Sequence, residues 1–439
     1  MEDLESIPST ATHVARSDHN ISRGDISDNA LKVLYRLKKA GYAAYLVGGG
    51  VRDLLLGGHP KDFDVATDAT PEEVKKLFRN CRLIGRRFRL AHVYFGDETI
   101  EVATFRAHHA QAEDEGHGVV EDGMLVRDNV YGSVEDDAWR RDFTVNALYY
   151  NIRDFSVVDF TGGMPDLKQR VLRMIGDPEV RLQEDPVRML RAVRLAAKLA
   201  FEIAPDTEQQ ITAQAERLGA VPPARLFDEV LKMFHGGHAL ATLHALRKYG
   251  LFTWLFPATE ACLASDDGFT LPFVERALQN TDQRIAQEKS VTPAFLFAAL
   301  LWTPVARHAQ RLQAGGMAEM QSLQVAGDDV ISQQLATITI PRRFQTPMRE
   351  IWAGQARLTN RRGKRPMRLV ETPRFRAAYD FLLLRYEAGE EELGELCGWW
   401  TAFQDQDNEG RRRMCDSLHK DKPRRRRGRR RRKTATPEA

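Results

Sequence analysis

Cysteine is scarce in this chain of 439 residues: the four cysteines, Cys81, Cys262, Cys397 and Cys415, are scattered, and no C-x-x-C pair occurs. This spacing excludes a disulfide scaffold and a zinc site built from cysteine pairs. Long apolar runs are also absent, since the longest, residues 294–302, is about half of a membrane span. The acidic start MEDLESIPST has no signal-peptide character. We therefore expect a folded, soluble and cytoplasmic protein.

Two glycine motifs of nucleotide-binding proteins are missing as well. The segment YLVGGGVRDLLLG has glycines from Gly48 to Gly50, but G-x-G-x-x-G would need a glycine where Asp53 stands, and G-x-x-x-x-G-K-[ST] does not occur. The segment instead predicts an apolar strand ending near Val47, a glycine turn, and a short helix starting around Val51. Two interpretations stay open: the glycines cradle a phosphate, or they only allow a tight turn.

The stretch PKDFDVATDATPEE places Asp62 and Asp64 on either side of Phe63 in a short apolar strand. Side chains alternate along a strand, so both carboxylates lie on one face, with backbones about 6.6 Å apart. The pair repels unless a cation lies between the carboxylates, and carboxylate oxygen is a ligand that magnesium prefers. A solvated sheet edge is the alternative. The adjacent glycine turn favours a metal site beside a phosphate site.

Local patterns divide the chain into an α/β head and an all-helical body. One helix is predicted after Ser27, and a second after Thr70, which forms a capping-box pattern with Glu73. Residues 91–105 predict a hairpin, in which Glu101 stands in a largely apolar strand. Glu101 is either a third carboxylate of the metal site or a strand-edge residue paired with an arginine. From about residue 165 onward the pattern is helical.

Charge is distributed unevenly along the chain. Residues 422–439 contain ten Lys or Arg and one Glu, a balance of +9 in a chain of net charge +3, which leaves −6 for residues 1–421. Such a segment cannot bury a core, and its usual partner is a polyphosphate such as RNA. Further basic patches in the helical part, Arg342, Arg343 and residues 360–368, indicate a surface for a nucleic-acid backbone.

Two more segments carry polar clusters. WRRDFTVNALYYN, residues 139–151, contains side chains able to bind triphosphate oxygens and ribose hydroxyls; the alternative is a charged helix start before a buried face. QEDPVRMLRAVRLAAK, residues 183–198, predicts one helix with Glu184, Arg188 and Arg191 on one face.

The motifs LVGGGVRDLLLG, KDFDVATDATPEE, RRDFTVNALYYN and EDPVRMLRAVR occur in that order, and with them the chain closely resembles the class II tRNA nucleotidyltransferase and poly(A) polymerase family over residues 22–235. The resemblance implies an α+β fold: a polymerase-β-like nucleotidyltransferase head with a mixed sheet and helices, then an all-helical body and a disordered basic tail. The expected segments are a flexible N-terminus (1–20), the catalytic head (21–164), a helical neck with the base-recognition helix (165–235), a helical RNA-binding body (236–420) and an arginine-rich tail (421–439).

The same resemblance implies roles for the residues that match the motifs. The catalytic pair Asp62 and Asp64 would hold Mg²⁺, and the other matched positions would bind the nucleotide. Those on the triphosphate are Gly48, Gly49 and Arg52; those on the triphosphate and sugar are Arg141, Asp142 and Asn146; those that read the base are Glu184, Asp185 and Arg188. Because Pro186 follows it, Asp185 is also a good N-cap, and a purely structural role stays open.

Within this family, LIGRRFRLAHV at residues 83–93, the long helical body and the arginine-rich tail resemble the bacterial poly(A) polymerases. The predicted reaction is template-independent transfer of AMP from ATP to RNA 3′ ends with release of pyrophosphate, which promotes RNA turnover. The alternatives are a CCA-adding tRNA nucleotidyltransferase and a non-catalytic RNA-binding adaptor; the intact D-x-D and RRD motifs argue against the adaptor. The expected partners are ATP, RNA 3′ ends and RNA-decay proteins, and no integral membrane segment is expected.

Overall fold

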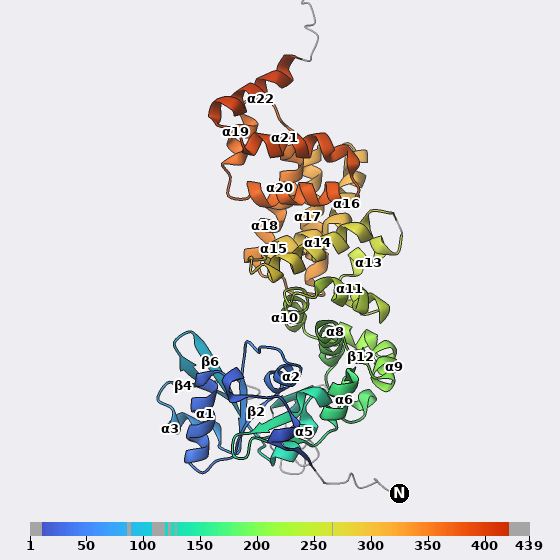
Figure 1. The fold of residues 1–439 in the computed structure, drawn as a ribbon. Coiled ribbons are helices and arrows are strands. Elements are labelled where there is room, and N and C mark those ends of the chain that lie inside the picture. Colours follow the sequence, from blue (N-terminus) through green and yellow to red (C-terminus); the bar gives the residue numbers. More distant parts are fainter. Residues whose placement is uncertain are drawn as a thin grey trace, which may run out of the picture. The chain divides into compact units, whose positions relative to one another are not determined.

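The computed structural model describes residues 11–85, 89–107, 119–121, 124–127, 130–265 and 267–420. They form two compact units that divide between Leu255 and Phe256 (Figure 1). The predicted tail lies outside the described residues, and the five-segment division stays a prediction. In the described ranges, no helix has the length and apolar character needed to cross a bilayer.

The first unit is built on a mixed eight-stranded sheet with the order β1-β10-β9-β2-β3-β6-β5-β4. Only β3 and β6 pair in parallel among its neighbours. The strands are β1 (Thr12–Val14), β2 (Ala44–Val47), β3 (Asp64–Thr67), β4 (Cys81–Ile84), β5 (Leu90–Phe95), β6 (Glu98–Thr104), β9 (Leu148–Asn151) and β10 (Val157–Asp159). Two small sheets lie apart from it: β7 (Val119–Glu121) with β8 (Met124–Arg127), and β11 (Val171–Leu172) with β12 (Glu202–Ile203).

In the first unit, helices are interspersed with the strands up to β10, and the chain after β10 is mostly helical. They are α1 (Asp28–Lys39), α2 (Gly49–Leu55), α3 (Pro71–Leu77), α5 (Val134–Arg140), α6 (Gly163–Gln169), α7 (Pro178–Glu184), α8 (Val187–Leu199), α9 (Pro205–Ala213), α10 (Pro223–Phe234), α11 (Ala239–Lys248) and α12 (Phe252–Leu255). Short 3₁₀ turns join them, of which η3 (Thr144–Asn146) matters for the site. The mixed sheet with helices confirms the predicted fold class of the head.

Several local predictions are confirmed. The Ser27 hydroxyl accepts from the Ala30 N–H at the start of α1, and Thr70 and Glu73 form the capping box of α3. Strands β5 and β6 form the predicted hairpin. Another expectation differs from the structure: Thr12–Val14, within the segment expected to be flexible, pairs with β10 as an edge strand, because β10 offers an unpaired edge that the sequence does not reveal.

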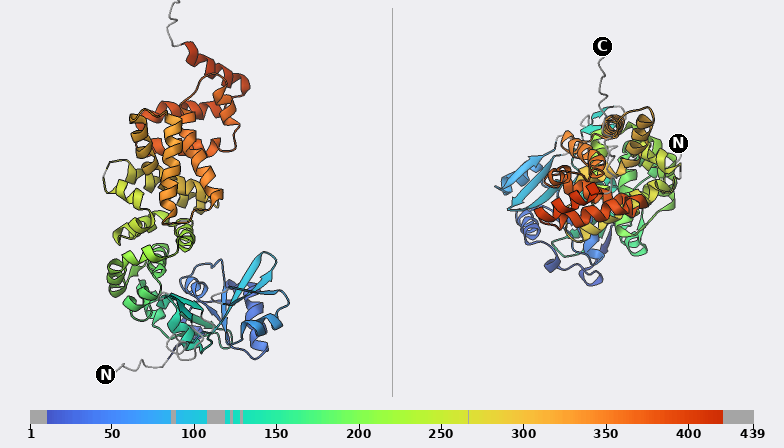
Figure 2. Two further views of the ribbon diagram at one scale, coloured as in Figure 1. Left: turned by 180° about the vertical axis from the view of Figure 1, so that it is seen from behind. Right: turned by 90° about the horizontal axis from the view of Figure 1, so that it is seen from above.

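The second unit is all-helical within its described residues, as predicted for the body. Its helices are α13 (Pro257–Leu263), α14 (Thr270–Ala286), α15 (Pro293–Leu300), α16 (Trp302–Ala314), α17 (Glu319–Leu335), α18 (Arg342–Leu358), α19 (Arg365–Val370), α20 (Phe375–Glu387), α21 (Gly394–Gln404) and α22 (Asn408–Lys420). Figure 2 shows this part of the chain in yellow to red. Aromatic side chains fill its core: the Phe381 ring lies edge-on to Phe273, and the buried Trp400 indole donates to the Leu358 carbonyl. Burial of the Trp400 indole removes apolar surface from water, and the hydrogen bond of its N–H fixes the orientation of the ring.

The sheet face that bears Val47, Ala66 and Tyr149 packs against Ala138 of α5 in one buried cluster. Helices α1 and α3 also pack against sheet strands. Residues directly opposite each other on paired strands point to the same face. The register therefore fixes which side chains share the face that α5 covers.

We expect Gly163→Ala to destabilise the first unit. A Cβ at Gly163, the first residue of α6, would lie 2.3 Å from the Thr144 carbonyl oxygen, and that neighbour is backbone of η3 rather than a flexible side chain. The clash should lower the free energy of unfolding by about 2 kcal/mol or more, measured by urea titration followed by circular dichroism. Gly398→Ala on α21 is the matched control, because nothing lies within 4 Å of its Cβ position. Equal unfolding midpoints for both variants would contradict this account.

Candidate active site

A glycine turn joins β2 to α2. Gly48 has φ 77° and ψ −141°, a conformation that residues with a side chain rarely adopt. The helix begins at Gly49, two residues before the predicted start, because Gly48 already serves as its N-cap. A Cβ on Gly48 would lie 3.5 Å from Arg141 Nη1 and 3.9 Å from Asp64 Oδ2. The turn thus brings bare backbone next to a guanidinium and a carboxylate from distant segments.

The two aspartates lie as the alternation predicts. Phe63 between them is buried, whereas Asp62 and Asp64 are exposed; Asp62 precedes β3 and Asp64 is its first residue. Although the Asp64 side chain reaches solvent, surrounding protein displaces part of its water. That desolvation and the charge of Glu101 raise the pKa of Asp64 to about 6, against the opposing effect of Arg141. Carboxylate oxygens that repel one another are the ligands that a hard divalent cation such as Mg²⁺ prefers, so Asp62 and Asp64 could hold such a cation.

Glu101 lies directly beside Asp64, because the two residues are partners in the parallel pairing of β6 with β3. Among the described residues its ion-pair partner is His92, with 3.3 Å between Nε2 and Oε2, and not an arginine. Among the residues that the structure describes, no three His, Cys, Asp or Glu side chains form a metal-binding group. A ligand role for Glu101 stays a prediction.

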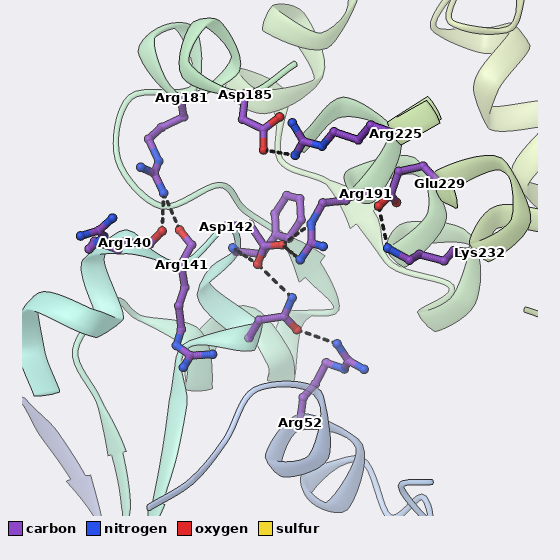
Figure 3. Close-up of polar contacts among 12 residues, drawn as sticks. Arg52, Arg140, Arg141, Asp142, Arg181, Asp185, Arg191, Arg225, Glu229 and Lys232 are labelled. Carbon is purple, nitrogen blue, oxygen red and sulfur yellow. Dashed lines mark hydrogen bonds and ion pairs between the residues drawn. The ribbon is translucent and has the colours of Figure 1, made fainter. Parts of the chain in front are cut away.

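A chain of polar contacts crosses from α2 to α8 (Figure 3). Arg52 pairs with Asp53 and donates from Nη1 to Asn146 Oδ1 at 2.6 Å. Asn146 Nδ2 donates in turn to Asp142 Oδ1 at 3.1 Å, and Arg191 Nε donates to Asp142 Oδ2 at 2.8 Å. The predicted residues Arg52, Asp142 and Asn146 therefore lie together, held by Arg191.

Burial would raise the pKa of Asp142, but the charge of Arg191 and the hydrogen bonds from Arg191, Asn146 and the Phe143 N–H lower it below its ordinary value. The pKa of Arg191 is raised by the same pair. Asp142 is thus an anion whose side chain is only 11% exposed, with both oxygens engaged. Its carboxylate orients Asn146, whose position it fixes from one side while Arg52 fixes it from the other.

Residues 183–198, which carry the residues expected to read the base, were predicted to form one helix, and this prediction is wrong. The chain breaks into α7 and α8 at Asp185 and Pro186, since the residue before a proline is disfavoured in helical conformation. Glu184 and Arg188, which were predicted to share one helix face, form an ion pair across the break at 2.8 Å. Asp185 Oδ1 accepts from the Val187 N–H, and its Oδ2 pairs with Arg225 at 2.6 Å. Asp185 therefore has a structural role, and its contact with a base stays a prediction.

Arg181 is a residue that the sequence patterns did not single out. Its Nη2 donates at 2.7 Å to the carbonyl oxygens of both Arg140 and Arg141 (Figure 3). Its Nη1 pairs with Glu184. It ties α7 to the segment that carries Arg141. Arg181 and Glu184 lie three positions apart, a spacing that allows an ion pair on a helix, and this spacing could have indicated the role of Arg181.

Asp137 and Tyr149 were also not singled out. Both contact Arg141: Asp137 Oδ2 pairs with Nη2 at 3.0 Å, and the Tyr149 hydroxyl accepts from Nε at 2.9 Å. The alternative of a charged helix start before a buried face is met in part: Phe143, Ala147 and Leu148 are buried. No α-helix starts there, because α5 ends at Arg140 and β9 begins at Leu148.

Three regions match known family models: the poly A polymerase head domain at residues 44–173, the probable RNA and SrmB-binding site of polymerase A at residues 200–263, and the polymerase A arginine-rich C-terminus at residues 315–434. Poly(A) polymerase I of Salmonella typhimurium is 52% identical over 424 residues, which cover 95% of this chain and 91% of the relative.

Similarity to CCA-adding enzymes is more distant. The enzyme of Geobacillus stearothermophilus is 37% identical over 226 residues, or 52% of this chain and 54% of the relative. The crystal structure of the Bacillus stearothermophilus CCA-adding enzyme in complex with CTP superimposes with a TM-score of 0.56 at 25% identity, covering 89% of this chain and 82% of that one.

We expect Arg191→Met to destabilise the protein in a pH-dependent way, because it leaves the largely inaccessible Asp142 carboxylate without its cation. At pH 7 the free energy of unfolding should fall by about 1–3 kcal/mol. This is less than the loss on breaking a fully buried ion pair, because the Arg191 side chain is 38% exposed. Because the pKa of Asp142 is lower in the folded protein than its ordinary value of 3.8, the ionised carboxylate stabilises the folded protein at pH values above 3.8. This stabilisation is lost as the pH falls through the folded-state pKa of Asp142. Urea unfolding should therefore show a smaller deficit at pH 3 than at pH 7.

The exposed pair of Arg349 with Asp328 supplies the control for this experiment. Arg349→Met should change the free energy of unfolding little at either pH. A deficit of Arg191→Met that is equal at pH 3 and pH 7 would show that lost packing, rather than the ion pair, causes it.

Proposed function

The chain belongs to the bacterial poly(A) polymerase family, as its motifs predict, and we propose that it adds AMP units from ATP to RNA 3′ ends without a template. The observation that carries this proposal is the extent of the similarity: the match to poly(A) polymerase I spans nearly the whole chain, whereas the match to a CCA-adding relative spans about half. The long helical unit therefore supports polyadenylation over CCA addition.

In the proposed reaction, the primer 3′-hydroxyl attacks the α-phosphorus of ATP, and pyrophosphate leaves. Asp62 and Asp64 would hold Mg²⁺, which when bound lowers the pKa of the attacking hydroxyl and stabilises charge on the phosphates. The Gly48 turn would let the triphosphate approach the backbone, and Arg141 would neutralise part of its charge. Catalysis in this scheme is mainly positioning and charge stabilisation.

Nucleotide selection is proposed to lie at the start of α8. Gly49 and Arg52 would border the triphosphate, while Asn146, fixed between Arg52 and Asp142, would meet the sugar. Glu184, Asp185 and Arg188 would present polar groups to the Watson–Crick edge of adenine. Each of these groups already has a defined geometry from its protein partners, which is what discrimination by hydrogen bonding requires.

RNA binding is proposed for two further regions. Residues 200–263 match the model described as the probable RNA and SrmB-binding site of polymerase A, which supports contacts with RNA and with a protein partner. Binding of RNA-decay proteins is part of the proposal. The ten basic residues of the tail would add affinity through phosphate contacts and counterion release. A cytoplasmic location and a role in RNA turnover complete the proposal.

The proposal is tested by incubating the protein with Mg²⁺, a generic RNA primer and each nucleoside triphosphate separately. A long ladder from ATP alone is expected. Addition of two C residues and one A from mixed nucleotides, followed by a stop, would show CCA addition instead. Stoichiometric primer binding with no extension would show a non-catalytic adaptor.

We expect Asp62→Asn and Asp64→Asn each to reduce AMP transfer by about three orders of magnitude or more, since either change removes a ligand of the metal site. Single-turnover extension of a labelled primer measures the rate, and circular dichroism checks the fold. Asp97→Asn is the matched control, because Asp97 is an exposed aspartate in the turn between β5 and β6. Near-normal extension by either site variant would refute the metal assignment.

We expect Arg188→Ala to lower kcat/KM for ATP more than for the other nucleoside triphosphates, because the site loses a polar match to the base. Arg188 also donates to the Arg181 carbonyl at 2.6 Å, so thermal unfolding must be measured alongside. Primer extension with all four nucleotides separates the two roles. Equal losses with every nucleotide would assign Arg188 to holding α7 against α8 only.

A further inference from the structure

The guanidinium of Arg141 is held along one edge and open along the other. Nε donates to the Tyr149 hydroxyl at 2.9 Å, and Nε and Nη2 both donate to Asp137 Oδ2, at 3.3 and 3.0 Å. Within the described part of the chain, Nη1 has no hydrogen-bond partner. The side chain is 23% exposed, so this edge is the part that solvent or a ligand can reach.

The two residues that hold Arg141 are themselves fixed. Tyr149 lies on β9 and is fully buried, and its hydroxyl donates to Asp137 Oδ2 at 2.7 Å. Asp137 lies one turn before Arg141 on α5 and is 7% exposed. The three groups form a closed triangle of hydrogen bonds in which no member can rotate without breaking two contacts.

Strand register determines where the open edge points. Val47 pairs with Tyr149 on one side and with Asp64 on the other, so the three side chains share one sheet face. Next to this row, a Cβ on Gly48 would lie 3.5 Å from Nη1 of Arg141. Nη1 therefore faces the space above the glycine turn, beside the carboxylate of Asp64.

We propose that Asp137 and Tyr149 are positioning residues that hold the guanidinium of Arg141 so that Nη1 meets the polyphosphate of the incoming nucleotide above Gly48. The inference rests on the proposed function for the identity of the anion. Arginine binds phosphate best when its planar fork is fixed beforehand, since less rotamer entropy is then lost on binding. The clamp supplies that preorganisation from outside the set of residues that touch the nucleotide.

A merely structural role would give different results. Buried ion pairs contribute little net stability, and a phenylalanine could fill the position of Tyr149 in the apolar cluster around Val47 and Ala138. If the triangle only joined α5 to β9, loss of the hydroxyl would lower stability and leave ligand preference unchanged. A positioning role instead weakens binding of polyphosphate selectively.

The test uses the full chain, Mg²⁺ and two probes without RNA: inorganic tripolyphosphate and adenosine. By isothermal titration, Tyr149→Phe should weaken tripolyphosphate binding about tenfold, the size expected for a hydrogen bond to a charged group, and leave adenosine binding unchanged. Tyr150→Phe is the matched control: Tyr150 is the next residue of β9, equally buried, and faces the other side of the sheet opposite Leu46. Its tripolyphosphate affinity should equal that of the wild type.

A double-mutant cycle shows whether the effect passes through Arg141. In an Arg141→Ala background, Tyr149→Phe should cause no further loss of tripolyphosphate affinity. Asp137→Asn should weaken tripolyphosphate binding in the wild-type background and cause no further loss with Arg141→Ala, which provides a second variant if Tyr149→Phe folds poorly.

The proposal is overturned if Tyr149→Phe weakens both probes equally, if its effect persists in the Arg141→Ala background, or if the wild type does not bind tripolyphosphate. Failure of the proposed function has a separate signature. Wild-type protein that binds tripolyphosphate through the clamp but does not extend RNA with ATP would refute polyadenylation and leave the clamp supported.

Discussion

The antiparallel pairing of β2 with β3 is the constraint on which the site depends. It sets Asp64 opposite Val47 at the point where β2 gives way to the glycine turn. Pairing of β3 with β6 then adds Glu101 to the row. A shift of one residue in either register would turn these carboxylates to the other face, away from α5 and Arg141. The hydrophobic side chains that alternate with them, among them Val65 and Val102, are buried and prevent that shift.

The candidate site is also lined by several arginine side chains that are buried or half-buried. Burial lowers the pKa of Arg140 to about 10 and lowers that of Arg181, and in each case neighbouring arginines contribute. Because guanidinium remains charged at neutral pH, the local repulsion is not relieved by deprotonation. Glu184 offsets part of it by accepting from Arg181 and Arg188. A polyphosphate ligand is the kind of anion that would balance the remainder, which agrees with the proposed use of ATP.

Supporting residues connect these two features. Arg181 binds the carbonyls of Arg140 and Arg141, and Arg191 binds Asp142, so α7 and α8 both hold the segment between α5 and η3. The side chains proposed to meet phosphate, sugar and base are thus linked through one segment of backbone. A change in any one of these contacts is expected to move the others, since residues in one network do not act independently.

Features that depend on near neighbours along the chain could be predicted from the amino-acid sequence. Caps at Ser27 and Thr70, the alternation around Phe63, the β5–β6 hairpin and the helical second half follow from side-chain hydrogen bonds, periodicity and turn residues within a few positions. The family also followed from the sequence, because four ordered motifs identify it jointly even where each is ambiguous alone.

Contacts between residues far apart in the sequence could be seen only in the folded chain. Asn146 is 94 positions from Arg52, and no local pattern indicates that their side chains bond. Among the described residues, Glu101 pairs with His92. Arg141 is held by the Tyr149 hydroxyl, and Tyr149 lies on β9, whose position in the sheet is set by its pairing with β2. Local propensity acts through a few bonds of backbone, whereas these contacts arise from sheet order and packing of the whole unit, which a single sequence does not specify residue by residue.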